Sequence, residues 1–266
     1  MVKIHSHLSH QWWKFINRKM KMKNLVTTFV IVSIALLAGC KKESKTPSGT
    51  NQNEIITQTT VMATVPNASV SNFAVLAGST ITNTGATTIT GDIGLSPGSS
   101  IGGFPPGILN GTKHINDSLA NQAKLDLTAA YNDAAGRTST DIVTLSGNIG
   151  GLTLTPGLYK STSSLAISSK DLTFDAKGNA DAVFIIQIAS SLTTTSGRQV
   201  ILSGGALASN IYWQVGTSAT FGTTSVFKGT VMAMQSITFN TGATLDGSAL
   251  ARIGAITMAG NTIVKQ

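Results

Sequence analysis

The sequence predicts a mostly β protein, a solenoid in which short strands stack coil upon coil. Between residues 210 and 264, a unit of three short strands occurs three times, and equivalent positions recur about every 17–20 residues. A single helical pattern, at residues 116–135, interrupts the strand-rich sequence. A repeat of this length that contains only strands is typical of a solenoid in which one repeat is one coil.

The middle strand of each unit carries the clearest pattern. Residues 219–222, 237–240 and 256–259 superpose without gaps. Because side chains alternate across a strand, the first and third positions point inward and the second and fourth point outward. The earlier segments 80–82, 165–168 and 192–195 fit the same template, although Thr194 then occupies an inward position.

Stacking these strands predicts an open face with two outward columns. The first column is Thr80, Ala166, Thr193, Thr220, Thr238 and Thr257. The second column is Thr82, Ser168, Thr195, Gly222, Asn240 and Ala259. None of these twelve positions carries a charge, so the predicted face is flat, uncharged and rich in threonine.

The first strand of several units is apolar on both sides, as at residues 183–186 and 211–213. Such a strand cannot be half-solvated, and the helix is the only element available to cover it. Asn116 or Asp117 can cap the start of this helix, and Gly136 ends it. Its predicted buried face is Leu119, Ala123, Leu127, Ala130 and Ala134.

The chain before and after the helix is expected to differ. Residues 71–94 fit one coil that precedes the helix, and the Gly- and Pro-rich residues 97–111 are predicted to be a loop. The coils resume after Asp141. The sequence therefore predicts one early coil, one long helix along a face, and a longer stack of later coils.

Residues 20–40 are predicted to be a targeting segment that is not part of the fold. Two lysines precede an apolar stretch, residues 25–37, that is too short for a comfortable membrane span. The segment ends in Leu-Ala-Gly-Cys, which resembles the lipobox of bacterial lipoproteins and implies lipidation of Cys40. Cys40 is the only cysteine and has no disulfide partner; a plain signal anchor or a structural thiol are the alternatives.

The domain organisation follows from these assignments. Residues 1–40 are an N-terminal extension plus lipoprotein signal peptide, residues 41–69 a disordered polar tether, and residues 70–266 the folded domain. Lys41 does not resemble the aspartate that is associated with inner-membrane retention of such lipoproteins. We therefore expect secretion across the inner membrane and attachment at the outer membrane or cell surface through the lipid anchor only. Release to the medium is the alternative.

The formal charge of +8 does not indicate a nucleic-acid partner. Six of the 19 basic residues, and no acidic one, precede Cys40, which leaves 13 basic against 11 acidic residues, or about +2. A balance this close to neutral gives no electrostatic case for nucleic-acid binding.

Five motifs in the folded part resemble those of the microbial ice-binding proteins of the DUF3494 type. They are FAVLAGS at 73–79, TGDIG at 90–94, AAYNDAAGR at 129–137, LTLTPGLY at 152–159 and IYWQV at 211–215. The resemblance covers roughly residues 70–266. It implies a discontinuous right-handed parallel β-helix of triangular section, in which the first coil lies beside the last and one long helix covers a face.

The resemblance also implies that the protein binds ice through the face made by the middle strands, which carries the twelve positions above. Neighbouring coils about 4.7–4.9 Å apart would present a rigid grid with spacings near those of the oxygens in ice. Threonine suits such a face because its χ1 angle is stiff and its hydroxyl can hold a water. We expect inhibition of ice growth and recrystallisation, with the ice surface as the partner of a monomer that needs no cofactor.

Two other classes of protein are alternatives to this hypothesis. An enzyme would need clustered carboxylates, but Asp92, Asp141, Asp171, Asp175, Asp181 and Asp246 occur singly near turns. His114 has no visible partner, and no Cys/His cluster indicates a metal site, so neither catalysis nor metal binding is expected. A cell-surface adhesin or carbohydrate-binding β-solenoid is the alternative that fits the anchor and tether equally well. Tyr212 and Trp213 are expected to pack in the core rather than to bind sugars.

Overall fold

The computed structural model of the chain describes residues 55–266. The predicted signal peptide, Cys40 and the first part of the predicted tether lie outside the described residues. Within the described part, no helix combines the length and the apolar character that crossing a membrane requires.

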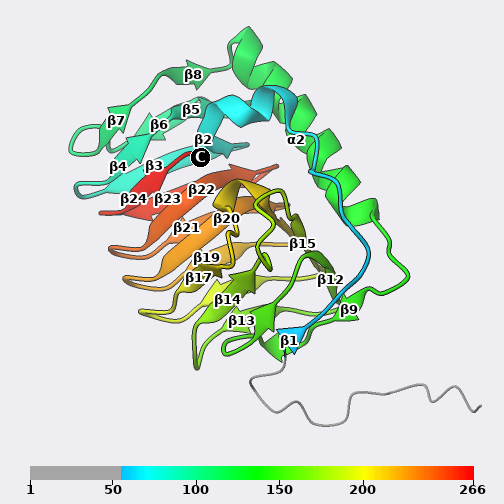
Figure 1. Cartoon of the computed structure of the whole chain (residues 1–266). Helices are drawn as coiled ribbons and strands as arrows, with labels where there is room; N and C mark the ends of the chain where they lie inside the picture. Colours follow the sequence, from blue (N-terminus) through cyan, green and yellow to red (C-terminus); the bar gives the residue numbers. More distant parts are fainter. Residues whose placement is uncertain (1–54) are drawn as a thin grey trace, which may run out of the picture. The chain divides into compact units, whose positions relative to one another are not determined.

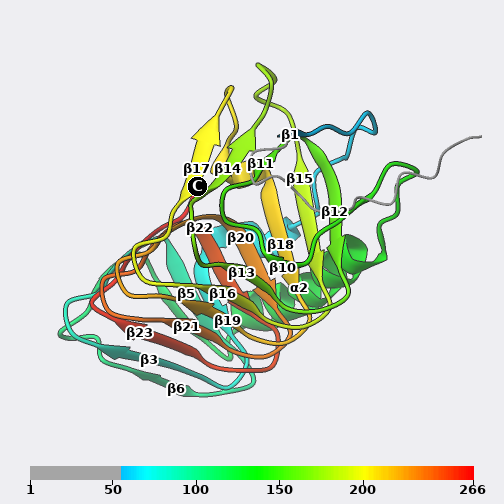
Figure 2. The ribbon, with the colours of Figure 1, turned by 90° about the horizontal axis from the view of Figure 1, so that it is seen from below.

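Three parallel sheets wrap around one apolar interior and form a β-helix, seen from the side in Figure 1 and after a quarter turn in Figure 2. The outer surface of the eight-stranded sheet is here called the middle face. Its strands are, in spatial order, β10 (Gly147–Asn148), β13 (Leu165–Ile167), β16 (Leu192–Thr194), β19 (Ala219–Phe221), β21 (Ile237–Phe239), β23 (Ile256–Ala259), β3 (Thr80–Thr84) and β6 (Ser100–Gly102).

The other two sides are the covered face, against which the helix packs, and the third face. The four-stranded sheet belongs to the third face and contains β1 (Ile55–Ile56), β11 (Thr153–Leu154), β14 (Leu172–Asp175) and β17 (Val200–Ser203). The twelve-stranded sheet contains β7 (Ile108–Asn110), β4 (Thr88–Thr90), β24 (Thr262–Val264), β22 (Thr244–Ala251), β20 (Val226–Ala233), β18 (Ile211–Val215), β15 (Phe184–Ile188), β12 (Gly157–Ser161) and β9 (Val143–Thr144), and also β2 (Phe73–Ala77), β5 (Asp92–Leu95) and β8 (Lys113–Ile115).

Two long strands of this sheet turn a corner without a break. The first halves of β20 and β22 lie on the third face, and their second halves lie on the covered face. Gly229 and Gly247 sit at the bend with φ of +105° and +142°. A Cβ on Gly247 would lie 2.1 Å from the carbonyl oxygen of Gly229 in the next coil, so only glycine allows the coils to stack here.

The stacking order of the coils differs from their order in the chain. The last coil contacts the first: β22 pairs with β2, β23 with β3 and β24 with β4. Figure 1 shows this junction as red strands beside cyan ones, with helix α2 running along the stack. The discontinuous β-helix that the resemblance implied is thus confirmed.

The segment before the helix forms two coils rather than one coil and a loop. β5, β6 and β7 make the second of these coils, and β8 pairs with β5. The prediction of a loop at residues 97–111 was therefore wrong over β6 and β7. These strands form the end of the stack, where Ile101 and Leu109 are only partly buried, so their apolar pattern is weak.

Helix α2 spans Ser118–Gly136, and Asp117 is its N-cap. The Asp117 carboxylate accepts a hydrogen bond from the Ala120 N–H at 2.8 Å. The predicted apolar stripe packs against the covered face, with Ala123, Leu127 and Ala134 fully buried. Two short 3₁₀ helices, η1 (Ala68–Asn72) and η2 (Ala208–Asn210), complete the secondary structure of the described residues.

Residues 57–72 run along α2 as an ordered strap, whereas the sequence predicted a disordered tether up to residue 69. The Asp141 carboxylate accepts hydrogen bonds from the backbone N–H groups of Thr59 and Thr60 at 2.6 and 2.9 Å. Arg137 donates to the carbonyl of Thr64 at 2.8 Å, and Val65 is buried. Few apolar residues hold this strap, so it lacks the periodicity by which a folded segment is recognised in a sequence.

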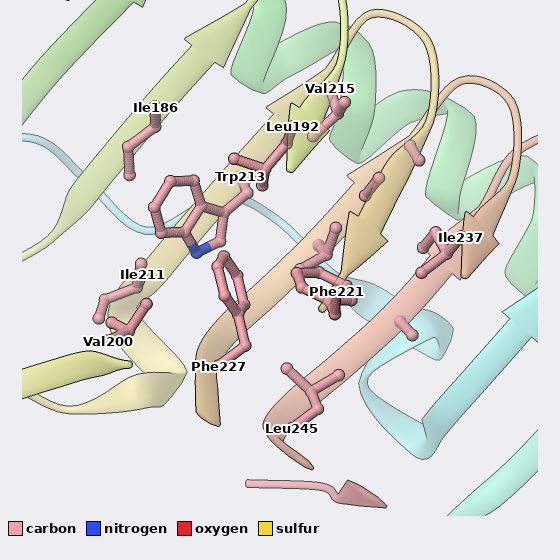
Figure 3. Close-up of a cluster of buried hydrophobic side chains, with 14 of the residues drawn as sticks. Ile186, Leu192, Val200, Ile211, Trp213, Val215, Phe221, Phe227, Ile237 and Leu245 are labelled. Carbon is pink, nitrogen blue, oxygen red and sulfur yellow. The ribbon is translucent and has the colours of Figure 1, made fainter. Parts of the chain in front are cut away.

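The interior between the three sheets is apolar, and part of it is shown in Figure 3. Trp213 lies fully buried among aromatic rings, 4.9 Å from Phe227 and 5.6 Å from Phe174 between ring centroids. Its indole N–H donates to the Lys228 carbonyl at 3.0 Å, so the one polar atom of the ring is paired. This core gives each coil a fixed position relative to the next.

Candidate functional site

The middle face carries a straight central column of outward residues, one from each coil. The strand registers place Ala166 beside Thr193, Thr193 beside Thr220, Thr220 beside Thr238, and Thr238 beside Thr257. Five of the six residues predicted for the first column are therefore brought together. Asn148 adjoins Ala166 at one end of this column.

The sixth residue was assigned to the wrong column. Thr82, not Thr80, lies beside Thr257, and Thr84 lies beside Ala259 where Thr82 was expected. The reason is that a slip of two residues leaves every side chain on the same side of a strand, so the alternating pattern could not distinguish the two registers. The central column therefore ends in Thr82 and Gly102.

Thr80 belongs to a further column that sequence reasoning missed. It pairs with Ser100, and the same position in the later coils is occupied by Ser164, Ser191, Ser218, Ser236 and Ala255. These serines bond to the adjacent coil: Ser191 Oγ donates to Ser164 Oγ at 2.8 Å, and Ser236 Oγ accepts from the Ala255 N–H at 3.2 Å. A serine directly before the first inward residue of most middle strands was the available signal.

The predicted second column lies at the corner where the middle strands end. Ser168, Thr195 and Asn240 are exposed there, and Ala259 is half-buried. Gly222 is buried instead, because the adjacent coil approaches closely here. A Cβ at this position would lie 2.5 Å from the carbonyl carbon of Thr195. Its N–H donates to the buried Oγ1 of Thr194 at 2.9 Å, which accounts for a threonine in an inward position. Gly222 thus closes a corner and offers no surface.

The central threonines keep their hydroxyls available to solvent. Among the described residues, the hydroxyls of Thr193, Thr220 and Thr238 have no hydrogen-bond partner, and Thr82 makes only a long contact of 3.4 Å with Thr257. Thr82, Thr193 and Thr257 are exposed, and Thr220 and Thr238 are half-buried. Stiff β-branched side chains with unpaired hydroxyls are suited to holding ordered water.

The inward side of the same strands fixes the face in place. Phe221 and Phe239 stack with centroids 4.8 Å apart, and both are buried. Ile237, Ile256 and Ile81 form the neighbouring inward row, also at full burial. A face supported by close-packed side chains keeps its spacing, because protein interiors leave little room for rearrangement.

Several ionisable residues of the described part make local contacts with neighbouring elements. His114 Nδ1 lies 2.6 Å from Asp117 Oδ2 at the start of α2, so His114 does have a partner, contrary to the sequence prediction. Hydrogen bonds from Ser139 and then from the strap lower the pKa of the Asp141 carboxyl. Among the described residues, no group of three His, Cys, Asp or Glu side chains could hold a metal ion.

The two aromatic residues considered for sugar binding are buried, Trp213 in the interior and Tyr212 against α2. The large exposed apolar residues of the described part are all aliphatic: Val61, Ile108, Ile115, Leu125, Ile201, Leu207, Ile253 and Val264. The described surface therefore offers no large exposed aromatic ring for stacking on a sugar.

A family model described as Ice-binding-like matches residues 75–264. The chain belongs to this family. It is 46% identical over 195 residues to an ice-binding protein of Nostoc sp. (strain HG1), which covers 73% of this chain and 71% of that protein. Among solved structures, an ice binding protein from an Antarctic biological consortium is 74% identical, with a TM-score of 0.77, over 78% of this chain and 93% of that chain. The DUF3494 domain of a Shewanella frigidimarina ice-binding protein is 28% identical with a TM-score of 0.73, over 77% and 99% of the two chains.

Proposed function

We propose that this ice-binding-family protein binds ice through the middle face and thereby inhibits ice growth and recrystallisation. The observation that carries the proposal is the central column of Thr193, Thr220, Thr238, Thr257 and Thr82, in register on a rigid and uncharged sheet. The names of the relatives support it, since each compared protein is described as ice-binding.

The mechanism follows from the spacing of the face and not from any single strong contact. Coils repeat about every 4.8 Å and same-side residues about every 6.5–7 Å along a strand, which gives a two-dimensional grid. Each ordered water costs about 0–2 kcal/mol of immobilisation, so affinity has to come from many waters held together on a preorganised plane. A charged side chain would orient nearby water around itself and disturb this lattice.

Adsorption of this kind needs no reaction, and we infer that the protein acts without catalysis. The ice lattice must then grow between adsorbed molecules as a curved surface, which is less favourable than a flat one. The expected consequences are thermal hysteresis and slower recrystallisation.

The experiment is ice-affinity partition of the full chain, with immobilised glycans as a parallel arm. We expect the protein to concentrate in a slowly growing ice phase and to show hysteresis. Exclusion from ice combined with retention on a glycan would overturn the proposal in favour of a carbohydrate-binding solenoid.

We further propose that Cys40 is lipidated and that the protein is held at the outer membrane or cell surface. The support is the Leu-Ala-Gly-Cys sequence after an apolar stretch and the absence of any second cysteine in the chain. Mass analysis of the membrane fraction tests this. Wild type should carry a lipid on its N-terminal cysteine, and Cys40→Ser should not; an unmodified wild-type thiol would contradict it.

A further inference from the structure

A buried polar network lies at the junction between the first and last coils. Asn83, Thr87 and Asn261 are 6%, 0% and 1% exposed, in an interior whose buried side chains are mostly apolar. Asn83 takes the inward position beside Met258, in the row that Phe221 and Phe239 occupy in later coils. A polar side chain in this row costs stability unless its hydrogen bonds are made.

The hydrogen bonds of the three residues are complete and run across four coils. Asn83 Nδ2 donates to the carbonyls of Gly85 and Gly103 at 3.0 and 2.8 Å, and Asn83 Oδ1 accepts from the Thr87 hydroxyl. Thr87 Oγ1 accepts in turn from the Asn261 N–H at 3.0 Å.

Asn261 extends the network in the other direction along the stack. Its Nδ2 donates to the carbonyls of Asn240 and Ala243 at 2.8 and 2.9 Å, and its Oδ1 accepts from the Ala259 N–H. The network therefore ties the two coils before the helix to the last two coils of the chain, across the place where the sequence is discontinuous.

This is also the place where the register is ambiguous. A slip of two residues would put Thr80 beside Thr257 and leave the inward and outward sets unchanged. The same slip would carry Asn83, Thr87 and Gly103 together, since all three precede the helix, but it would move Asn83 away from Met258 and Thr87 Oγ1 away from the Asn261 N–H. Only the observed register keeps the bond between Asn261 N–H and Thr87 Oγ1, whose hydroxyl Asn83 orients, and only this register aligns Thr82 with the central column.

We propose that Asn83, Thr87 and Asn261 form a register lock that positions the early coils so that the central column continues from Thr257 to Thr82. These three are positioning residues: they are buried and do not contact ice. A single buried polar group can select one register among apolar alternatives at some cost in stability, and this is the use of buried polar groups with the best support.

The register can be read directly by cysteine cross-linking in the full chain carrying Cys40→Ser. Thr82→Cys with Thr257→Cys reports the observed register, and Thr80→Cys with Thr257→Cys reports the slipped one. Neighbouring strands lie about 4.8 Å apart, within reach of a disulfide, whereas a two-residue offset puts the Cα atoms about 8 Å apart and out of reach. The parent protein should form only the first cross-link.

The double change Asn83→Leu and Thr87→Val removes the lock. It replaces both partners of one hydrogen bond with apolar groups of similar volume, a change that need not unfold a protein. We expect the Thr80–Thr257 cross-link to rise about two- to tenfold over the parent protein, the change that the loss of one hydrogen bond of typical net strength produces. The matched control is Thr194→Val, which removes a buried hydroxyl bonded to Gly222 in the same row but away from the junction.

Circular dichroism and the unfolding midpoint confirm that each variant is folded. If the double variant does not fold, Thr87→Val alone, which removes the acceptor of the Asn261 N–H, is tested with the same cross-linking pairs. Cross-linking only between Thr82 and Thr257 in a folded lock variant, as in the control, would overturn the proposal. The register lock rests on the proposed function only where it concerns thermal hysteresis. The cross-links report the register of the coils whether or not the protein binds ice.

Discussion

The middle face and the third face are built from the same coils, yet only the middle face is proposed to bind ice. The third face also has a column of β-branched residues in register: Val226, Thr244, Thr262, Thr88 and Ile108. Its coil spacing is the same because one solenoid sets both. A threonine column alone therefore does not distinguish the two surfaces.

The neighbouring columns make the difference. On the third face, Lys228 and Asp246 form an ion pair at 3.0 Å directly beside the threonines. A hollow of about 330 Å³ lies there, and its lining includes Val226, Thr244 and Val264. On the middle face the flanking column is serine, bonded to the adjacent coil. Under the proposed function, flatness and lack of charge across several columns therefore matter more than threonine content.

The largest expected effect comes from placing a bulky ring on one face or the other. Thr238→Tyr, in the centre of the middle face, should reduce thermal hysteresis by about tenfold, because the ring lifts the plane away from the ice lattice along several coils. Thr262→Tyr, at the equivalent place on the third face, should leave hysteresis near the wild-type value. Equal losses in the two folded variants would show that the faces do not differ in function.

A single charge tests the second difference between the faces. Thr220→Lys should cause a several-fold loss of hysteresis, since an ammonium group orders water around itself rather than in a lattice. Thr244→Lys adds the same charge beside Asp246 and should have little effect. Hysteresis measured at low and high salt is the readout, and an unchanged Thr220→Lys protein would count against the requirement for an uncharged plane.

The fold could be predicted from the sequence further than the face could. Alternation showed which residues point outward, since Ile237, Phe239, Ile256 and Met258 sit inward as their pattern required. It could not show the register of the first coil, because a shift of two residues leaves an alternating pattern unchanged. Gly222 was predicted to face outward for a different reason, because the alternating pattern does not show where a strand ends.

Two other differences have related causes. The strap at residues 57–72 is held mainly by side-chain hydrogen bonds to Asp141, Arg137 and Asp126, and these leave no apolar period in the sequence. The string Asn-Thr-Gly-Ala-Thr occurs at residues 83–87 and 240–244, but Asn83 is buried whereas Asn240 is exposed. The string is offset by one residue between the two coils: Asn83 is itself an inward residue of β3, beside Met258, whereas Asn240 follows the inward Phe239.

A smaller effect tests the corrected register of the middle face. Thr82→Ala removes one threonine of the central column and should reduce hysteresis by about half, because one of several water-holding positions is lost. Thr80→Ala changes the adjacent column instead and should be close to wild type. A larger loss in Thr80→Ala than in Thr82→Ala would favour the slipped register in solution.

The smallest effect concerns pH. The central column of the middle face has no titratable side chain, so hysteresis should stay constant between about pH 5 and 9, well away from acid unfolding. Stability should behave differently. Burial, and secondarily the charge of Arg252, lowers the pKa of Lys124 from 10.5 to about 8. Between these values the unfolded chain binds the proton more strongly, so the free energy of unfolding should rise with pH.

Chemical denaturation across this pH range measures the effect on stability, and Lys124→Met is the control in which the rise should be reduced. A hysteresis that follows the unfolding free energy with pH would show that the face is not independent of the helix side.

The most direct measurement is magnetisation transfer from ice protons to threonine methyl groups in a frozen solution of the labelled protein. The account predicts strong transfer to Thr193, Thr220, Thr238 and Thr257, and weak transfer to Thr244 and Thr262 on the third face. Equal transfer to both sets, or stronger transfer to Thr244 and Thr262, would contradict the assignment of ice binding to the middle face.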